Sequence, residues 1–156
     1  MIKILVTVSF FVFFTNCGFT PIYKISDNNM GSEGYSIEIV NQVSREIIEE
    51  INTNSLLDSE HKYVAFLNIK EDITPLIINT NGTVAKYRIE IEISYELIQK
   101  DTDEVVSFGK TRGNAQYDVV SSEISNEDTK KSMTKIATKN ALQIMYSRIQ
   151  SFIASK

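Results

Sequence analysis

The sequence contains one cysteine, Cys17, and one histidine, His61. A structural zinc site of the usual kind takes four cysteine or histidine ligands, so two such residues exclude it. A lone cysteine also cannot form a disulfide bond within the chain. His61 stands in the polar run 58–62, and we interpret it as an exposed loop residue rather than a general base. No metal ion or cofactor is therefore expected.

Recognisable catalytic sets are missing as well. The sequence has no phosphate-binding glycine loop and no evident nucleophile with a neighbouring base. Glu90, Glu92 and Glu96 could act as paired carboxylates in acid–base chemistry, but alternating charges on a solvated strand are a commoner reason for this spacing. We expect a protein that is not an enzyme, and a membrane-tethered enzyme is the disfavoured alternative.

An excess of basic residues is also absent, because the formal net charge is −4. Removing residues 1–16, which contain one lysine and no acidic residue, changes this value from −4 to −5. A mildly acidic surface does not attract nucleic acid, whose phosphates require a basic one. Any anionic ligand would therefore have to meet a local basic patch.

What the chain does have is an apolar N-terminus. Lys3 is followed by residues 4–14, which carry no charge. This run is short for a membrane-spanning helix and is typical of a secretory signal peptide. Cys17 then stands where a bacterial lipoprotein is cleaved and acylated, so we predict a lipoprotein signal peptide over residues 1–16 and lipid attachment at Cys17. Asn16 is larger than the residue usually found before such a cysteine, and an uncleaved anchor is the alternative.

Residues 17–34 are predicted to form the lipidated N-terminus and a linker. A diacylglycerol and an N-acyl chain on Cys17 would bury about three acyl chains, more than the two signals that stable anchoring needs. Gly18 stands where an aspartate would favour retention in the inner membrane, so we expect the outer membrane, with the domain on its periplasmic side. Residues 24–34 are polar and contain two glycines, as flexible linkers do.

Residues 35–156 are predicted to form one α+β domain. Residues 35–40 alternate apolar and polar side chains and predict a first strand. Asn41 is expected to cap the helix that follows. The apolar residues at helical spacing in that helix are Val43, Ile47, Ile48 and Ile51. Residues 62–71 predict a second strand, which Pro75 either ends or continues at the edge of the sheet.

The clearest pattern is the alternation over residues 83–99, which predicts a long, half-buried third strand. Its core-facing positions are Ala85, Tyr87, Ile89, Ile91, Ile93, Tyr95 and Leu97. A polar loop over 100–104 leads to a fourth strand over 105–117. Strict alternation in that strand places Val105 on the core side and Val106 on the other.

Residues 125–155 contain no glycine or proline and predict a long amphipathic helix that starts at Ser125 or Asn126. Its apolar positions are Met133, Ile136, Ala137, Ala141, Ile144, Met145, Ile149, Phe152 and Ile153. The predicted order is therefore β-α-β-β-β-α. We expect two helices packed on one face of a roughly four-stranded, mostly antiparallel sheet. The other face stays polar and must meet water or a partner.

Cys17 is followed by Gly-Phe-Thr-Pro-Ile-Tyr at 18–23, and residues 81–87 read Asn-Gly-Thr-Val-Ala-Lys-Tyr. Together with the element order, these residues resemble the lipopolysaccharide-assembly lipoprotein LptE family, in which Cys-Gly-Phe-x-Pro-Leu-Tyr is a recurrent opening of the mature chain. The resemblance covers essentially the whole chain after residue 16.

This resemblance implies an outer-membrane lipoprotein that partners and plugs the β-barrel of an LptD-like protein. It also implies that the protein supports barrel assembly and the transport and insertion of lipopolysaccharide. The polar sheet face would suit the polar lumen of a large barrel. A generic envelope lipoprotein that scaffolds another secretion or cell-wall complex is the alternative.

Basic residues on the polar sheet face are candidates for binding the phosphates or carboxylates of a glycolipid head group. They are Lys86, Arg88, Lys110 and Arg112. Pairing of the last two strands could bring them within a few ångströms of one another on that face. The alternative is that each one offsets a cross-strand glutamate such as Glu90. The matched family position after the turn is Thr83, which is uncharged.

Overall fold

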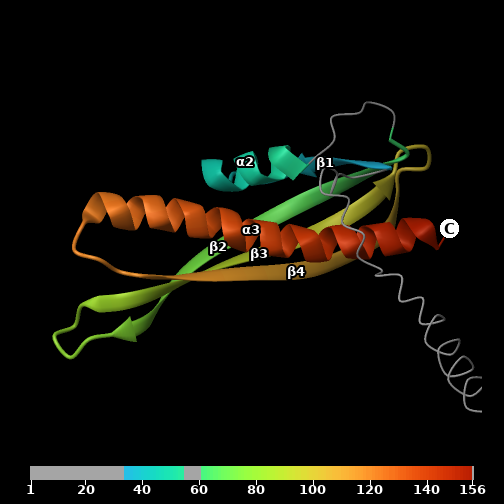
Figure 1. The fold of residues 1–156 in the computed structure, drawn as a ribbon. Coiled ribbons are helices and arrows are strands. Elements are labelled where there is room, and N and C mark those ends of the chain that lie inside the picture. Colours follow the sequence, from blue (N-terminus) through green and yellow to red (C-terminus); the bar gives the residue numbers. More distant parts are fainter. Residues whose placement is uncertain (1–33, 55–60, 156) are drawn as a thin grey trace, which may run out of the picture.

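The structure is a computed structural model that describes residues 34–54 and 61–155. The predicted signal peptide, the lipidation site at Cys17 and residues 18–33 of the linker lie outside the described residues. The elements are β1 (Tyr35–Ile39), α2 (Arg45–Asn54), β2 (Tyr63–Ile78), β3 (Val84–Gln99), β4 (Glu104–Asp118) and α3 (Glu123–Ala154). Their order is the predicted β-α-β-β-β-α (Figure 1).

The strands form one sheet in the order β1-β2-β3-β4. β1 and β2 are parallel, and α2 lies between them in the chain, because parallel neighbours need a long crossover connection. β2, β3 and β4 follow one another through short loops and pair antiparallel. The sheet is thus mostly antiparallel, and the α+β fold predicted from the sequence is confirmed.

The hydrophobic core lies between the sheet and the two helices. The fully buried side chains include Ile47 and Ile51 of α2, Ile89, Ile91, Ile93 and Leu97 of β3, and Leu142, Met145 and Ile149 of α3. Each contributes about 1.5–3 kcal/mol relative to an exposed position. Within residues 34–54 and 61–155, neither helix combines the length and the apolar character that crossing a lipid bilayer would need.

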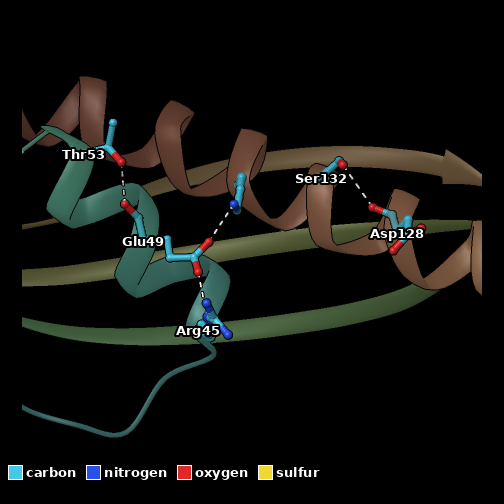
Figure 2. A network of polar contacts seen from close by, with 6 residues as sticks. Arg45, Glu49, Thr53, Asp128 and Ser132 are labelled. Atoms are coloured by element: carbon cyan, nitrogen blue, oxygen red, sulfur yellow. Dashed lines mark hydrogen bonds and ion pairs between the residues drawn. The ribbon is translucent and has the colours of Figure 1, made fainter.

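Two ion pairs that share Glu49 connect α2 to α3. Glu49 of α2 receives Lys135 Nζ at 2.8 Å on one carboxylate oxygen and Arg45 Nε at 2.7 Å on the other (Figure 2). The hydrogen bond from Lys135 lowers the pKa of the Glu49 carboxyl most, and the hydrogen bond from Arg45 lowers it further. Because Arg45 is exposed and Glu49 and Lys135 are only partly buried, these ion pairs contribute little to stability and mainly orient the two helices.

Gly113 of β4 allows α3 to lie close to the sheet. A Cβ atom at Gly113 would overlap the Ala137 carbonyl oxygen and approach the Ala141 nitrogen of α3. Four residues earlier in β4, a Cβ atom at Gly109 would lie 2.7 Å from the Tyr95 hydroxyl. The glycines therefore make room for a helix backbone and for an aromatic ring.

Pro75 does not end the second strand, because β2 continues to Ile78 with a register shift after Pro75. β1 pairs with β2 only as far as Leu67, so Pro75 lies on a strand edge where its missing N–H is tolerated. This confirms the alternative in which the second strand continues past Pro75 at the edge of the sheet.

The prediction that Asn41 caps the first helix is wrong. Its amide exchanges two hydrogen bonds with Ile69 of β2, donating to the carbonyl at 2.8 Å and accepting from the N–H at 2.9 Å. Asn41 thus continues the pairing of β1 beyond the end of that strand. α2 starts later, with the Ser44 carbonyl accepting from the N–H groups of Ile47 and Ile48.

A β-bulge reverses the predicted orientation of Val105 and Val106. Ser107 lies opposite Leu97, but Val105 lies opposite Ile98, so Val106 is an additional residue in β4. Val106 packs against the core, and Val105 is 51% exposed on the other face. Strict alternation along β4 fails at this point.

The last helix begins earlier than predicted. Ser122 is its N-cap and accepts a hydrogen bond from the Ser125 N–H, while Asn126 binds the backbone of Val120 instead. Two of the predicted apolar positions, Ile136 and Ile144, are not buried and are 44% and 42% exposed. The buried stripe instead includes Thr134 and Thr138, and the Thr138 hydroxyl donates to the Thr134 carbonyl.

Candidate functional site

The sheet has one face that neither helix covers, and we call it the open face. Its side chains come from the residues of β3 and β4 that alternate with the core positions. Ile89, Ile91 and Ile93 are buried beneath the helices, so Arg88, Glu90 and Glu92 project from the open face. The four basic residues named from the sequence all lie here.

Glu92 is the centre of an ion-pair cluster on the open face. Its carboxylate accepts Lys110 Nζ at 2.8 Å on one oxygen and Arg112 Nη2 at 2.6 Å on the other. Arg112 Nε lies 2.7 Å from the same oxygen as Nη2, and 3.7 Å from Glu90. The Glu92 side chain is only 18% exposed, whereas those of Lys110 and Arg112 are mostly exposed.

These contacts shift the pKa values of Glu92 and Arg112 in opposite directions. Hydrogen bonds from Lys110 and then Arg112 lower the pKa of the Glu92 carboxyl. The Glu92 contact also raises the pKa of the Arg112 guanidinium. Both shifts favour the charged forms of Glu92 and Arg112, so the ion pair between them is maintained at neutral pH.

The other two basic residues lie further along β3. Lys86 Nζ is 3.2 Å from an Asp118 carboxylate oxygen. Arg88 lies opposite Thr74 on one side and Gln116 on the other, and it has no ion pair among the described residues. Gln116 is four positions from Arg112 along β4, which corresponds to roughly 13 Å.

The structure thus places Lys86, Arg88, Lys110 and Arg112 on one face, but the register separates them into two groups. Lys110 and Arg112 pair with glutamate, as the alternative interpretation of these residues expected. Lys86 pairs with an aspartate, and Arg88 is the member that retains an unpaired charge among the described residues. Their contact with a glycolipid head group stays a prediction.

One end of the open face is apolar, which the alternation of the strands did not predict. Phe108 of β4 is 79% exposed, and Val105 lies exposed nearby. Phe66 of β2 is partly buried on the same face, because Phe66 and Phe108 both lie opposite Glu96. A phenylalanine at a polar position of an otherwise regular alternation was the available signal. We call Phe66, Val105 and Phe108 the apolar end.

His61 lies just before β2 and is not the exposed loop residue that the sequence suggested. It is partly buried, and its Nε2 atom is shielded from solvent without a hydrogen-bond partner among the described residues. Glu90, Glu92 and Glu96 do share the open face, but the pKa of Glu92 is lowered, which is the wrong direction for a general acid. Within residues 34–54 and 61–155, no group of three potential metal ligands comes together.

No protein-family model matches this sequence, and no curated protein matches it either. Solved structures with a similar fold include the rare lipoprotein B from Shewanella oneidensis, with 13% sequence identity and a TM-score of 0.57 over 78% of this chain and 96% of that one. An uncharacterized lipoprotein B from Nitrosomonas europaea has 12% identity and a TM-score of 0.60 over 85% and 92% of the two chains. A minor lipoprotein from Acinetobacter baumannii has 10% identity and a TM-score of 0.54 over 75% and 90%. At these identities the likeness establishes a shared fold.

Proposed function

We propose that this protein is an outer-membrane lipoprotein whose folded domain partners and plugs an LptD-like β-barrel. In that role it supports assembly of the barrel and the transport and insertion of lipopolysaccharide. Cys17 after an apolar signal segment supports the lipid anchor. The similar structures named as lipoproteins support the same class of protein. The observation that carries the proposal is the open face.

The open face has the chemistry that the lumen of a large barrel requires. Barrel interiors are polar, and a plug that enters one must bury charges without leaving them unpaired. Glu92 already has two cationic partners, so the cluster can lose water while its charges remain compensated. The apolar end supplies an exposed aromatic side chain, Phe108, of the kind that often dominates binding energy.

The experiment is affinity purification of the full-length, lipidated protein from envelopes solubilised in a mild detergent. Mass spectrometry should identify a large outer-membrane β-barrel as the main partner. Recovery of inner-membrane or cell-wall proteins alone would contradict the proposal and favour a scaffolding lipoprotein of another complex.

A matched pair of variants tests whether the open face makes the contact. Phe108→Asp places a charge at the apolar end, whereas Ile124→Asp places one at a similarly exposed apolar residue at the start of α3. The two side chains are 79% and 77% exposed, so neither change should affect folding much. Phe108→Asp should reduce recovery of the barrel more than Ile124→Asp, and equal recovery would remove the open face from the proposal.

Glycolipid contact is proposed on the same face, with Arg88 as its main residue. An unpaired guanidinium can bind a phosphate with two hydrogen bonds, whereas Lys110 is already engaged by Glu92. Arg88→Ser should therefore weaken lipopolysaccharide binding by the purified full-length protein more than Lys110→Ser does. Unchanged binding after replacing Lys86, Arg88, Lys110 and Arg112 together with serine would exclude this contact.

A further inference from the structure

The first turns of α3 stand over the sheet without packing into it. The buried side chains of α3 begin only at Thr134, and before it Asn126, Glu127 and Lys130 line a cavity of about 480 Å³. Its remaining lining residues are Ile73, Tyr87, Tyr117, Val119 and Glu123. The strand residues give this cavity an apolar floor, and the helix gives it a polar wall. We call it the α3 groove.

The α3 groove continues toward the start of α2. A second cavity of about 180 Å³ shares Ile73, Glu127 and Lys130 with the first. Its other lining residues are Ser44, Glu46, Glu71, Lys131 and Thr134. The Ser44 Oγ atom is shielded from solvent and has no hydrogen-bond partner among the described residues. The two cavities share three lining residues and so form one continuous groove.

Two stacked tyrosines form the floor of the groove. The ring centroids of Tyr87 and Tyr117 are 5.5 Å apart, with 25° between their planes. Burial is the main reason that the pKa of the Tyr117 hydroxyl is raised, and the nearby Tyr87 and Glu127 raise it further. The Tyr117 ring therefore stays neutral beside the Glu127 carboxylate. A neutral tyrosine ring with a carboxylate next to it is a favourable environment for a cation.

The charges of the groove point to the same class of ligand. Its two cavities are lined by four carboxylates, Glu46, Glu71, Glu123 and Glu127, and by two ammonium groups, Lys130 and Lys131. None of the six makes an ion pair within the described part of the chain. The start of α3 is not an anion site, since Ser122 caps the Ser125 N–H and Glu123 lies in the first turn.

We propose that the α3 groove binds an arginine side chain of a partner protein. The guanidinium lies against the Tyr117 and Tyr87 pair and donates to Glu127 or Glu123, and the aliphatic stem covers Ile73 and Val119. Arginine suits the site better than lysine because its planar group both stacks on an aromatic ring and forms two parallel hydrogen bonds to a carboxylate. This binding site is separate from the open face and does not depend on the partner being a barrel.

The test uses the full-length protein in non-ionic detergent micelles and two small probes. Nα-acetyl-arginine amide carries the guanidinium, and Nα-acetyl-citrulline amide is its uncharged equivalent of the same shape. The arginine probe should shift the ring NMR signals of Tyr87 and Tyr117 and bind about tenfold more tightly than the citrulline probe. Equal affinities, or shifts confined to other residues, would overturn the proposal.

Variants on α3 give the matched control. Glu127→Gln removes a carboxylate that lines the groove and should weaken binding of the arginine probe about tenfold. Asp128→Asn removes the same charge one residue later, at an exposed position that does not line either cavity, and should leave binding unchanged. Both residues are exposed, so both variants should fold, and Glu123→Gln provides an independent second change. An equal loss in Glu127→Gln and Asp128→Asn, or no loss in Glu127→Gln, would contradict the proposed site.

Discussion

Glu92 of β3 and Arg112 of β4 face each other across the sheet, with 2.6 Å between a carboxylate oxygen and Nη2. Lys110 holds the second Glu92 oxygen, so one carboxylate organises two cations on a face without helices. This arrangement leaves Arg88 as the candidate glycolipid contact without an ion pair among the described residues. The contacts around Glu92 thus connect the sheet register to the proposed docking and binding properties of the open face.

The first prediction concerns the titration of Glu92. Its two cationic partners should hold the pKa below the ordinary value of 4.5. Because the folded-state pKa is lowered, the contribution of the cluster to stability is present above the unfolded-state pKa and is lost as the pH falls through the folded-state value. NMR titration of the side-chain carboxyl should show that Arg112→Ser raises this pKa. An unchanged midpoint in Arg112→Ser would show that the pair does not form in solution.

The second prediction concerns the close approach of β4 and α3. Gly113→Ala should lower the free energy of unfolding by about 3 kcal/mol, because the new methyl group meets helix backbone that cannot rotate away. Asn114→Ala, at an exposed position next to it, should change stability by less than about 0.5 kcal/mol. Urea denaturation of the two variants makes the comparison. Equal stability would mean that α3 lies further from the sheet.

The third prediction concerns two buried tyrosines. The hydroxyls of Tyr35 and Tyr146 are shielded from solvent and have no hydrogen-bond partner among the described residues. Burial is the main reason that the pKa of each is raised well above the ordinary value of 10.0. The contribution of these two tyrosines to stability should be fully present below about pH 10 and be lost above it, because only the unfolded chain then loses these protons.

Replacing these tyrosines with phenylalanine tests that account. Tyr35→Phe should raise the free energy of unfolding by about 1 kcal/mol at neutral pH, since it removes an unsatisfied buried hydroxyl. Together with Tyr146→Phe, it should also flatten the loss of stability above about pH 10. Denaturation at several alkaline pH values measures both effects. An equally steep loss in the double variant would contradict the burial of these hydroxyls.

The sequence predicted regular elements well and irregular contacts poorly. The alternation of β3 was sufficient to predict the strand and its buried face, because five of its side chains enter a continuous core: Ile89, Ile91, Ile93, Tyr95 and Leu97. Val105 and Val106 were misassigned, since a bulge depends on how two strands meet rather than on the pattern of one. Asn41 was misassigned because its side chain pairs with Ile69, a contact 28 residues away.

In the candidate sites, too, the sequence predicted the regular features and missed those that depend on tertiary contacts. Alternation placed the four basic residues of the open face together, but only the register separated Arg88 from the cluster around Glu92. The α3 groove had no sequence signal. It arises because the first turns of a helix that reads as continuous carry polar side chains over an apolar part of the sheet.

The fourth prediction concerns the lipid anchor. Cys17→Ala should prevent acylation and shift the protein away from the outer-membrane fraction. The domain from β1 onward should still fold, because none of its core side chains lies near Cys17 in the sequence. Membrane fractionation and far-UV circular dichroism of the same variant measure the two effects. Loss of the folded domain, or normal outer-membrane recovery, would contradict the predicted role of Cys17.

The most direct test of the account is photo-crosslinking from the open face. Phe108→p-benzoylphenylalanine introduces a crosslinker at the apolar end, in the full-length protein and in intact cells. Ultraviolet irradiation followed by mass spectrometry should identify a large outer-membrane β-barrel joined to this position. Crosslinks only to inner-membrane, cell-wall or unrelated envelope proteins would contradict the proposed role as the plug of a barrel.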